Sequence, residues 1–446
     1  MRSLRIGSGA GFSGDRLDAA VELAQRGELD WLALECLAER TIALAQLRRR
    51  KDEGSGYDPQ LHRRMHALLP IVTRSGTRLI TNMGAANPLA AGRAVIEIAR
   101  ALRLDITVAV VSGDDVLAQL DDRLAAMESG VPLAHYAPIV SANAYLGVDA
   151  ILPAIATGAD VIITGRVADP SLFVAPILHH FGWRADDWDH VAHATSIGHL
   201  LECAGQLCGG YFADPGRKDV PNMARLGFPF ADVHDGAPAV LGKVDGTGGC
   251  ITLATAKEQL LYEVTDPFGY VTPDVIADFS RVELRAIGPD RVGVAGAKAS
   301  GRPERLKVSV GYVAGFIGEG EIAYAGPNAL ARAELAARII RERVQDRFEE
   351  LRIDLIGASS LHGRALDPYA RSYEVRLRVA ARAQTAEQAA IVGEEVEALY
   401  TNGPAGGGGA RRNVVEQVGI VSALIARDQV TPSVTVLDTV THAEAV

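Results

Sequence analysis

Three side chains capable of acid, base or nucleophilic chemistry lie close together in the segment Gly198-His-Leu-Leu-Glu-Cys203. On a helix, His199, Glu202 and Cys203 would occupy positions i, i+3 and i+4 and share one face. A histidine whose tautomer is fixed by a carboxylate can act as a general base, so all three are candidate catalytic residues. A metal site and plain core packing are the alternatives. Because the spacing is no standard zinc pattern, we assign no metal ligand.

Polar side chains also follow short apolar runs that predict buried strands. Glu35 comes directly after residues 31–34, and Asn82 comes shortly after residues 78–80. Residues just past the carboxyl ends of parallel strands line the ligand crevice. Glu35 is therefore a candidate catalytic carboxylate, and Asn82 could orient a substrate carbonyl or carboxylate. Glu39 would share a helix face with Glu35, so that one carboxyl group could act as an acid and the other as a base. The alternative is that both glutamates only interact favourably with a helix dipole.

Arg166 and Asp169 follow a third run of this kind, residues 161–163. The planar guanidinium of Arg166 suits a carboxylate or a phosphate, and the neighbouring glycine admits a close approach. Asp169 could orient Arg166 or a substrate hydroxyl, and we include it among the catalytic candidates. The alternative is a helix cap combined with a structural salt bridge.

Three glycine-rich stretches are candidate anion sites, because backbone N–H groups in such turns attract phosphate or carboxylate. The spacing of the first stretch matches neither a dinucleotide fingerprint nor a P-loop. Tight turns, helix caps and a linker are the alternatives. The candidate residues are Gly9, Gly11, Ser13, Gly248, Gly249, Gly407, Gly408 and Arg411.

The elements that must position these residues alternate between strand and helix in the first half. Residues 17–26 and 88–102 have helical spacing, and residues 106–111 are nearly all β-branched, as in a strand buried on both faces. Strand, loop, helix and strand in this order favour a mostly parallel sheet with helices on both faces. We assign this α/β domain, with the candidate active site, to residues 1–225.

Residues 226–446 are expected to form a second, α+β domain that carries the last glycine-rich loop. Runs of two-residue period, such as residues 306–312 and 373–379, flank two helical stretches at residues 328–347 and 385–400. Strand pairs with two helices over one face satisfy that order.

Composition narrows the class of protein. The formal net charge of -10 argues against nucleic acid or an anionic membrane as the main partner. Four scattered cysteines fit a reducing compartment, and no window approaches the roughly 18 apolar residues of a membrane span. We expect a soluble, cytoplasmic protein that forms a homo-oligomer. No hydrolase elbow, HExxH or Walker motif is present, and the sequence assigns no cofactor.

Several segments, in order along almost the whole chain, resemble the acyclic terpene utilisation (AtuA) family. The resemblance implies a role in the bacterial catabolism of acyclic terpenes, a route through acyl-CoA intermediates. It also implies a small companion protein, which corresponds to the C-terminal domain of longer members. The segments are Glu35-Cys-Leu-Ala-Glu-Arg-Thr41, Thr81-Asn-Met-Gly84, Gly165-Arg-Val-Ala-Asp-Pro-Ser-Leu172, Gly198-His-Leu-Leu-Glu-Cys203, Cys208-Gly-Gly-Tyr-Phe-Ala-Asp214, Gly246-Thr-Gly-Gly249, Gln259-Leu-Leu-Tyr-Glu263, Thr272-Pro-Asp274 and Gly403-Pro-Ala-Gly-Gly-Gly-Gly409.

Together these features predict a catabolic enzyme of lyase, hydratase or isomerase type that acts on a small carboxylate or an acyl-CoA. His199 or Glu202 would be the general base, while Arg166 and the glycine-rich loops hold the anion. One alternative is a non-catalytic subunit that binds an acyl-CoA for a catabolic complex. Another is a hydrolase with Cys203 as nucleophile.

Overall fold

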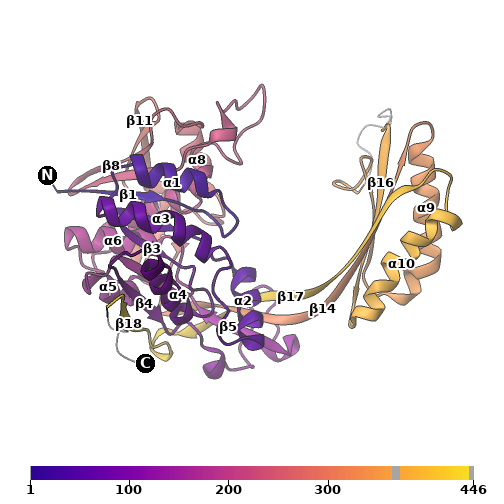
Figure 1. The fold of residues 1–446 in the computed structure, drawn as a ribbon, viewed down its shortest axis with the longest axis horizontal. Coiled ribbons are helices and arrows are strands. Elements are labelled where there is room, and N and C mark those ends of the chain that lie inside the picture. Colours follow the sequence, from indigo (N-terminus) through magenta and orange to yellow (C-terminus); the bar gives the residue numbers. More distant parts are fainter. Residues whose placement is uncertain (1, 364–371, 441–446) are drawn as a thin grey trace. The chain divides into compact units, whose positions relative to one another are not determined.

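The computed structural model of the chain describes residues 2–363 and 372–440. It contains two compact units: the chain up to Gly311 and again from Ile420 forms the first, and Tyr312 to Gly419 forms the second. Figure 1 shows the elements of both units. Neither unit begins or ends at residue 225, where the sequence predicts a domain boundary.

A ten-stranded sheet organises the first unit, in the order β11-β12-β8-β7-β1-β2-β3-β6-β4-β18. The five consecutive strands from β1 to β4 in this order are parallel, and the strands on either side of them pair antiparallel. The strands are β1 (Ser3–Ser8), β2 (Trp31–Leu34), β3 (Arg78–Thr81), β4 (Thr107–Ser112), β6 (Val161–Thr164), β7 (Pro229–His234), β8 (Ala237–Lys243), β11 (Glu283–Gly288), β12 (Arg291–Ala295) and β18 (Ser433–Asp438).

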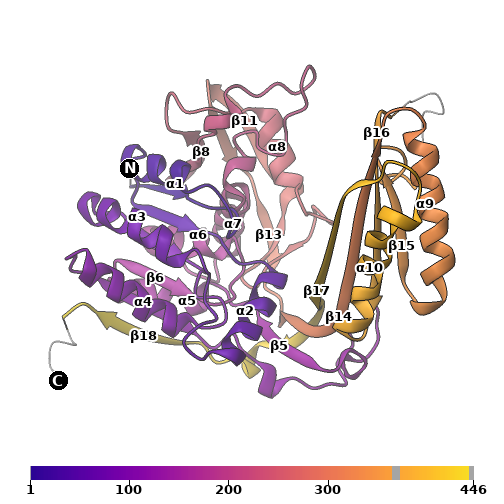
Figure 2. The same cartoon turned by 45° about the vertical axis from the view of Figure 1, so that its right-hand side comes forward.

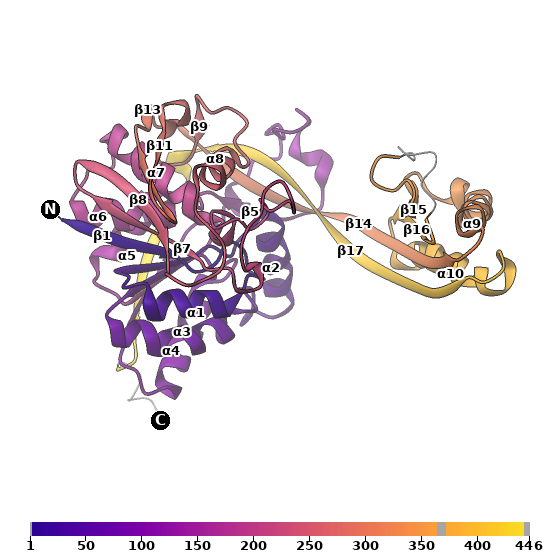
Figure 3. The same cartoon turned by 90° about the horizontal axis from the view of Figure 1, so that it is seen from above.

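Helices cover both faces of the parallel strands, as predicted. Helices α1 (Leu17–Arg26), α3 (Leu61–Ser75) and α4 (Pro88–Ala101) pack together on one face, and α5 (Val148–Ala156), α6 (Ser171–Phe181) and α7 (Trp188–Glu202) pack together on the other (Figure 3). The apolar faces of α1, α3 and α4 bury leucine, valine and isoleucine side chains against the sheet. Helices α2 (Glu39–Lys51) and α8 (Leu253–Leu261) complete the longer helices of this unit.

Shorter elements surround the main sheet. Strand β5 (Ile139–Ala144) pairs with the start of β14, and a small sheet has the order β13-β10-β9. Its strands are β9 (Tyr270–Val271), β10 (Ile276–Asp278) and β13 (Lys298–Gly301). The 3-10 helices of the chain are Leu117–Gln119, Leu133–Tyr136, Ala204–Gln206, Met223–Arg225, Phe279–Arg281, Gln345–Arg347 and Arg427–Gln429.

The second unit has α+β architecture, as the alternating runs and helical stretches predict. Its sheet has the order β15-β16-β14-β17, and two helices pack on one face of it (Figure 2). Alternate residues of β16, such as Val375, Leu377 and Val379, point into this core, as the two-residue period of a strand requires. The elements are β14 (Arg305–Ala325), α9 (Ala329–Val344), β15 (Leu351–Ile356), β16 (Glu374–Ala383), α10 (Ala386–Asn402) and β17 (Gly408–Ala426).

Candidate active site

The carboxyl ends of the parallel strands bring together most of the polar residues expected from the sequence. Glu35 follows β2, Asn82 follows β3, Arg166 comes shortly after β6, and Asp114 comes shortly after β4. These side chains are buried. Because parallel strands end at the same edge of a sheet, residues far apart in the sequence meet there.

Asn82 connects the loops after β2 and β3. Its side-chain oxygen accepts a hydrogen bond from the N–H of Cys36 at 2.7 Å, and its side-chain nitrogen donates to Glu35 Oε1 at 2.9 Å. The N–H of Leu37 donates to the same oxygen at 2.7 Å. Burial, assisted by the charge of Asp169, raises the pKa of Glu35 to about 8. Glu35 is therefore a carboxyl group that holds its proton at neutral pH.

Glu39 does not share a helix face with Glu35, so this expectation is wrong. Helix α2 begins at Glu39, and Glu35 lies in the loop before it. Glu39 instead accepts hydrogen bonds from the Tyr145 hydroxyl at 2.5 Å and from Lys307 Nζ at 3.2 Å. Burial opposes its ionisation, but these two partners outweigh burial and lower the pKa of Glu39 to about 2.

The Arg166 guanidinium is enclosed and forms internal bonds. It donates to the carbonyl oxygens of Leu37 and Val167 and to the carboxylate of Asp169, and it stacks over the Tyr145 ring at 4.6 Å. Its side chain is 1% exposed. The structural salt bridge considered for this pair is thus present, whereas direct binding of a substrate anion by Arg166 stays a prediction.

Asp114 supports Arg166 from the neighbouring strand end. Its Oδ2 accepts from the backbone N–H of Arg166 at 3.0 Å and from the side-chain amide of Asn143 at 2.8 Å. Burial raises the pKa of Asp114 to about 6. The segment after β6 is therefore fixed through its backbone as well as through its side chains.

His199 and Glu202 face one another on the last turn of α7, as their spacing predicts. His199 Nδ1 lies 2.8 Å from Glu202 Oε1, the imidazole also interacts with the backbone of Gln259 and Leu260, and the buried atom Glu202 Oε2 has no hydrogen-bond partner among the described residues. The rings of Tyr270 and Phe279 enclose the imidazole at 5.0 and 5.4 Å between centroids. Burial lowers the pKa of His199 to about 4 and, with the charge of Asp169, raises that of Glu202 well above its usual range.

Cys203 follows the helix as its C-terminal cap residue and is partly exposed. Burial and the charge of Glu202 both raise the pKa of its thiol. A thiolate is the reactive form of cysteine, so this environment disfavours nucleophilic attack by Cys203.

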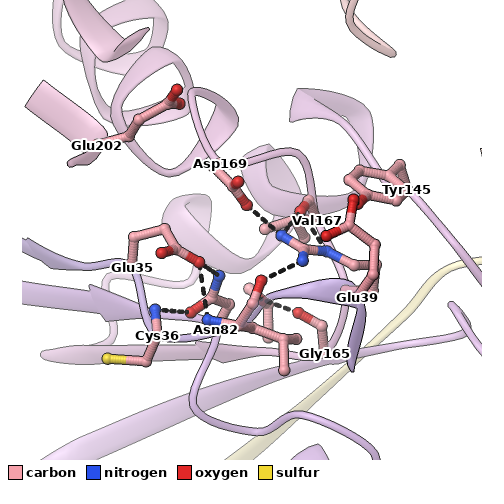
Figure 4. Close-up of polar contacts among 12 residues, drawn as sticks. Glu35, Cys36, Glu39, Asn82, Tyr145, Gly165, Val167, Asp169 and Glu202 are labelled. Carbon is pink, nitrogen blue, oxygen red and sulfur yellow. Dashed lines mark hydrogen bonds and ion pairs between the residues drawn. The ribbon is translucent and has the colours of Figure 1, made fainter. Parts of the chain in front are cut away.

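Glu35, Asp169 and Glu202 form one electrostatic group, although they come from three separate elements (Figure 4). The charge of Asp169 raises the pKa of both other carboxyls, and the nearby Arg166 lowers it. Burial raises the pKa of Asp169 itself, and Arg166 opposes that rise. Like charges in a poorly solvated site cannot all ionise, so such a group holds exchangeable protons near neutral pH.

A cavity of about 1010 Å³ reaches this group from the surface of the first unit. Asp169 and Glu39 line it, and Tyr270, whose ring contacts His199, lines it as well. Its other lining residues include Met127, Tyr145, Val271, Ile276, Arg302, Arg305, Leu306, Lys307 and Leu424. The cavity thus offers apolar walls together with cationic groups.

The first glycine-rich loop uses its glycines for packing. The N–H of Gly9 bonds to the carbonyl oxygen of Ala33 at 2.7 Å, and the N–H of Gly11 bonds to Asp15 at 2.9 Å. A Cβ at Gly11 would lie 2.6 Å from the backbone carbon of Cys203. The carbonyl oxygen of Ser13 accepts a hydrogen bond from the buried Arg64. Anion binding by this loop stays a prediction.

The second glycine-rich stretch also has internal partners for its backbone. The N–H groups of Gly248 and Gly249 donate to the carbonyl oxygens of Arg225 at 2.7 Å and Pro221 at 2.8 Å. Gly248 lets this loop approach the backbone of Asn222 and Arg225, and Gly249, with a φ of 82°, lies against the backbone of Cys208.

The third glycine-rich stretch belongs to the second unit, whereas Glu35, Asp169 and Glu202 all lie in the first. Gly407 packs near Tyr324, Gly408 begins β17, and Arg411 is exposed on that strand. Their predicted role in binding an anion stays untested.

Sequence reasoning missed several residues of the site: Asp114, Asn143, Tyr145, Gln259 and Tyr270. Asp114 follows a predicted strand, so the rule that found Glu35 and Asn82 would also have found it. Gln259, which donates to the carbonyl oxygen of His199 at 3.0 Å, lies in a segment that carries the family resemblance. No local sequence pattern links Tyr270 to His199, because the two residues are far apart in the sequence and meet only through tertiary packing.

Fold and site together define an α/β protein with a group of ionisable side chains at the carboxyl edge of parallel strands. Residues 4–436 match the model of the acyclic terpene utilisation family protein AtuA, so the chain belongs to the AtuA family and is related to acyclic terpene utilisation. Neither the curated proteins nor the solved structures yielded a match.

Among residues 2–363 and 372–440, no three His, Cys, Asp or Glu side chains are grouped so that they could hold a metal ion. Within the same residues, every helix is too short or too polar to cross a membrane.

Proposed function

We propose that this AtuA-family chain is an enzyme of lyase, hydratase or isomerase type that acts on a small carboxylate or an acyl-CoA by general acid/base chemistry. The observation that supports this most is the buried His199–Glu202 pair beside Asp169, which lines the large cavity: Glu202 Oε2 has no hydrogen-bond partner among the described residues. Buried polar groups without partners are rare in native structures and occur where a ligand or water completes them.

Asp169 is the member of the group that reaches the cavity, and we assign it the first proton transfer. Its raised pKa lets it take a proton from a substrate carbon next to a carbonyl, and its bond to Arg166 fixes its orientation. Arg166 is then a positioning residue. Arg305, which lines the cavity without an ion-pair partner among the described residues, is the candidate group for holding the substrate anion.

The His199–Glu202 pair supplies the second exchangeable proton. Burial disfavours charge on both members, so at neutral pH a protonated Glu202 donates to His199 Nδ1, and Nε2 carries the ring hydrogen. The pair can then donate a proton to a developing oxyanion or to a leaving group without separating charge in the protein interior.

One observation favours the alternative of a non-catalytic acyl-CoA-binding subunit. His199 does not line the cavity, and Tyr270 separates it from that space.

We also propose that the protein is cytoplasmic, forms a homo-oligomer and acts with a small companion protein.

Proton exchange tests the proposal directly. The full chain is incubated with short acyl-CoAs and dicarboxylates in D₂O, and deuterium incorporation is followed by mass spectrometry. We expect exchange that falls about 10²- to 10⁴-fold in Asp169→Asn and in His199→Gln. Asp186→Asn, a change at an exposed carboxylate away from the cavity, is the matched control.

Circular dichroism and thermal melts must show that each variant folds. Exchange that survives both substitutions would refute the assigned roles. Ligand binding without exchange by the wild-type chain would establish the non-catalytic alternative.

A further inference from the structure

A second cavity, of about 880 Å³, opens beside α8 in the first unit. It meets the site described above at Gln259, which lines this cavity and also donates to the carbonyl oxygen of His199. None of the proposed chemistry uses this space. Its volume is in the range of cavities that bind cofactor-sized molecules.

Aromatic rings form one wall of the second cavity. Tyr211 and Tyr262 lie edge to face, with ring centroids 6.2 Å apart, and Phe212 is adjacent. The side chain of Tyr211 is 85% exposed. An exposed ring at the mouth of a cavity is a stacking surface for a flat ligand.

The backbone at this wall is held in an unfavourable conformation. Tyr211 and Glu263, which both line the cavity, have φ values of 61° and 58°, in the left-handed region that residues other than glycine rarely adopt. Such conformations persist where the surrounding structure fixes them, and they gather at binding sites.

Three cationic and three acidic side chains line the cavity, and two of the cations are available to a ligand. Each carboxylate has a partner: Asp219 accepts from the N–H of Gly216, Glu258 pairs with Lys218 at 2.6 Å, and Glu263 interacts with the Tyr262 hydroxyl. In contrast, the side chains of Arg217 and Lys257 have no partner among residues 2–363 and 372–440. Two free cations at the mouth suit an anion such as a phosphate.

A buried acceptor lies on the inner side of the cavity. Gln259 is 2% exposed, and its Oε1 has no hydrogen-bond partner among the described residues. An amide oxygen in this state requires an N–H or O–H donor, because a buried acceptor without a partner costs free energy. The amino group of an aromatic heterocycle is such a donor.

We infer that the second cavity binds a nucleoside diphosphate group. The base stacks on Tyr211 with its edge toward Tyr262, its amino group donates to Gln259 Oε1, and the phosphates lie on Arg217 and Lys257. The group could come from a free nucleotide or from the carrier end of an acyl-CoA. Only the second source rests on the proposed function.

Isothermal titration of the full chain with ADP, adenosine, pyrophosphate and coenzyme A tests this inference. We expect ADP to bind, and the double variant Arg217→Gln/Lys257→Gln to bind it at least tenfold more weakly while its affinity for adenosine is unchanged. Tyr211→Asn keeps a residue that tolerates the left-handed backbone and should weaken both ADP and adenosine at least fivefold. Arg123→Gln, at an exposed arginine outside both cavities, is the control.

Coenzyme A that binds at least tenfold more tightly than ADP indicates the carrier end of a thioester, and equal affinities indicate a free nucleotide. Absence of ADP binding up to about 1 mM, or equal ADP affinity in the double variant, would overturn the inference. His199→Gln should still bind ADP, so loss of proton exchange and loss of nucleotide binding are separable results.

Discussion

Burial raises the pKa of two nearby carboxyl groups at this site, Glu35 and Glu39, but their different partners give the two groups opposite net shifts. Glu35 accepts hydrogen bonds from uncharged donors and forms no ion pair with the described residues, and its pKa rises to about 8. Glu39, four residues later, contacts Lys307 and the Tyr145 hydroxyl, and its pKa falls to about 2. The residue type alone therefore does not determine whether a glutamate at this site is protonated at neutral pH, because its hydrogen-bond and ion-pair partners also set its pKa.

This contrast predicts how stability depends on pH. The pKa of Glu35 is higher in the folded chain than in the unfolded chain, so its stabilising effect is present below about pH 4.5 and is lost as the pH rises through about 8. Glu35→Gln should remove this loss. The variant should gain stability relative to wild type between pH 5 and pH 9, on the order of a few kcal/mol at most, since one pKa unit corresponds to about 1.4 kcal/mol.

Thermal melts of both proteins across that range provide the measurement. Glu39→Gln is the matched control: its folded pKa is depressed, so its difference from wild type should stay constant from pH 5 to pH 9 and shrink only in stronger acid. A Glu35→Gln protein that follows the pH profile of wild type would show that Glu35 does not titrate in this window.

Part of the site could be predicted residue by residue. Helical spacing is a local property, so the contact between His199 and Glu202 follows from the sequence. The enclosure of Arg166 does not, because its partner Leu37 comes from a distant loop whose position depends on the packing of β2 against β3. The glycines at 9 and 11 suggested an anion, yet their amide hydrogens have partners within the protein.

At the scale of elements, one buried carboxylate joins the starts of two helices, α5 and α6, which follow the segments that hold Tyr145 and Asp169. Asp274, in the segment Thr272-Pro-Asp274, accepts from the N–H of Val148 at the start of α5 at 2.7 Å and from the Ser171 hydroxyl at the start of α6 at 2.5 Å. A Cβ on Gly147 would lie 2.0 Å from Asp274 Oδ1, so this approach requires glycine. A negative charge at two helix N-termini is also favoured by their dipoles.

Asp274→Ala should therefore destabilise the protein substantially. Hydrogen bonds to a charged group contribute about 1.5–3 kcal/mol each, and the substitution also leaves a buried helix start without its acceptor. Ser171→Ala removes only one of the two bonds and should cost less. Chemical unfolding of both variants measures the difference; equal losses would show that the contact with α5 contributes nothing.

Local elements of the parallel core were predictable because each has its own periodicity. Residues 17–26 and 31–34 match α1 and β2, and residues 88–102 match α4 to within one residue. The neighbours of a strand were less predictable. Strands β7, β8, β12 and β11 extend the first sheet from β1. The pairs β7–β8 and β11–β12 are local hairpins, but the pairings of β7 with β1 and of β12 with β8 are long-range and leave no local pattern.

At the scale of the whole molecule, the first unit is assembled from two distant parts of the chain. Strand β18 follows the second unit in sequence but pairs antiparallel with β4, with Val434 opposite Val111 and Leu437 opposite Val108. Leu437 also packs against the core under α4. This return of the chain is the reason that a single cut at residue 225 does not separate the compact units.

A chain that ends at residue 429 should consequently be unstable and prone to aggregation. Its loss of β18 uncovers the edge of β4 and part of the core, and an uncovered apolar edge strand pairs with other chains. Size-exclusion chromatography and thermal melts of the truncated chain test this expectation. Val440→Ser, at an exposed residue beyond the strand, is the control; a monomeric truncated chain with wild-type stability would show that β18 is dispensable.

The course of β14 and β17 has a consequence for how such a protein can vary. Residues 312–419 form one uninterrupted excursion, which leaves the first unit along β14 and returns along β17, its neighbour in the five-stranded sheet. The described part of residues 312–419 contributes no strand to the ten-stranded sheet. The second unit is thus an insertion in the first. It can be exchanged, shortened or enlarged while the strand order of the first unit is kept. The ionisable side chains at the carboxyl edge of its sheet then also keep their connectivity.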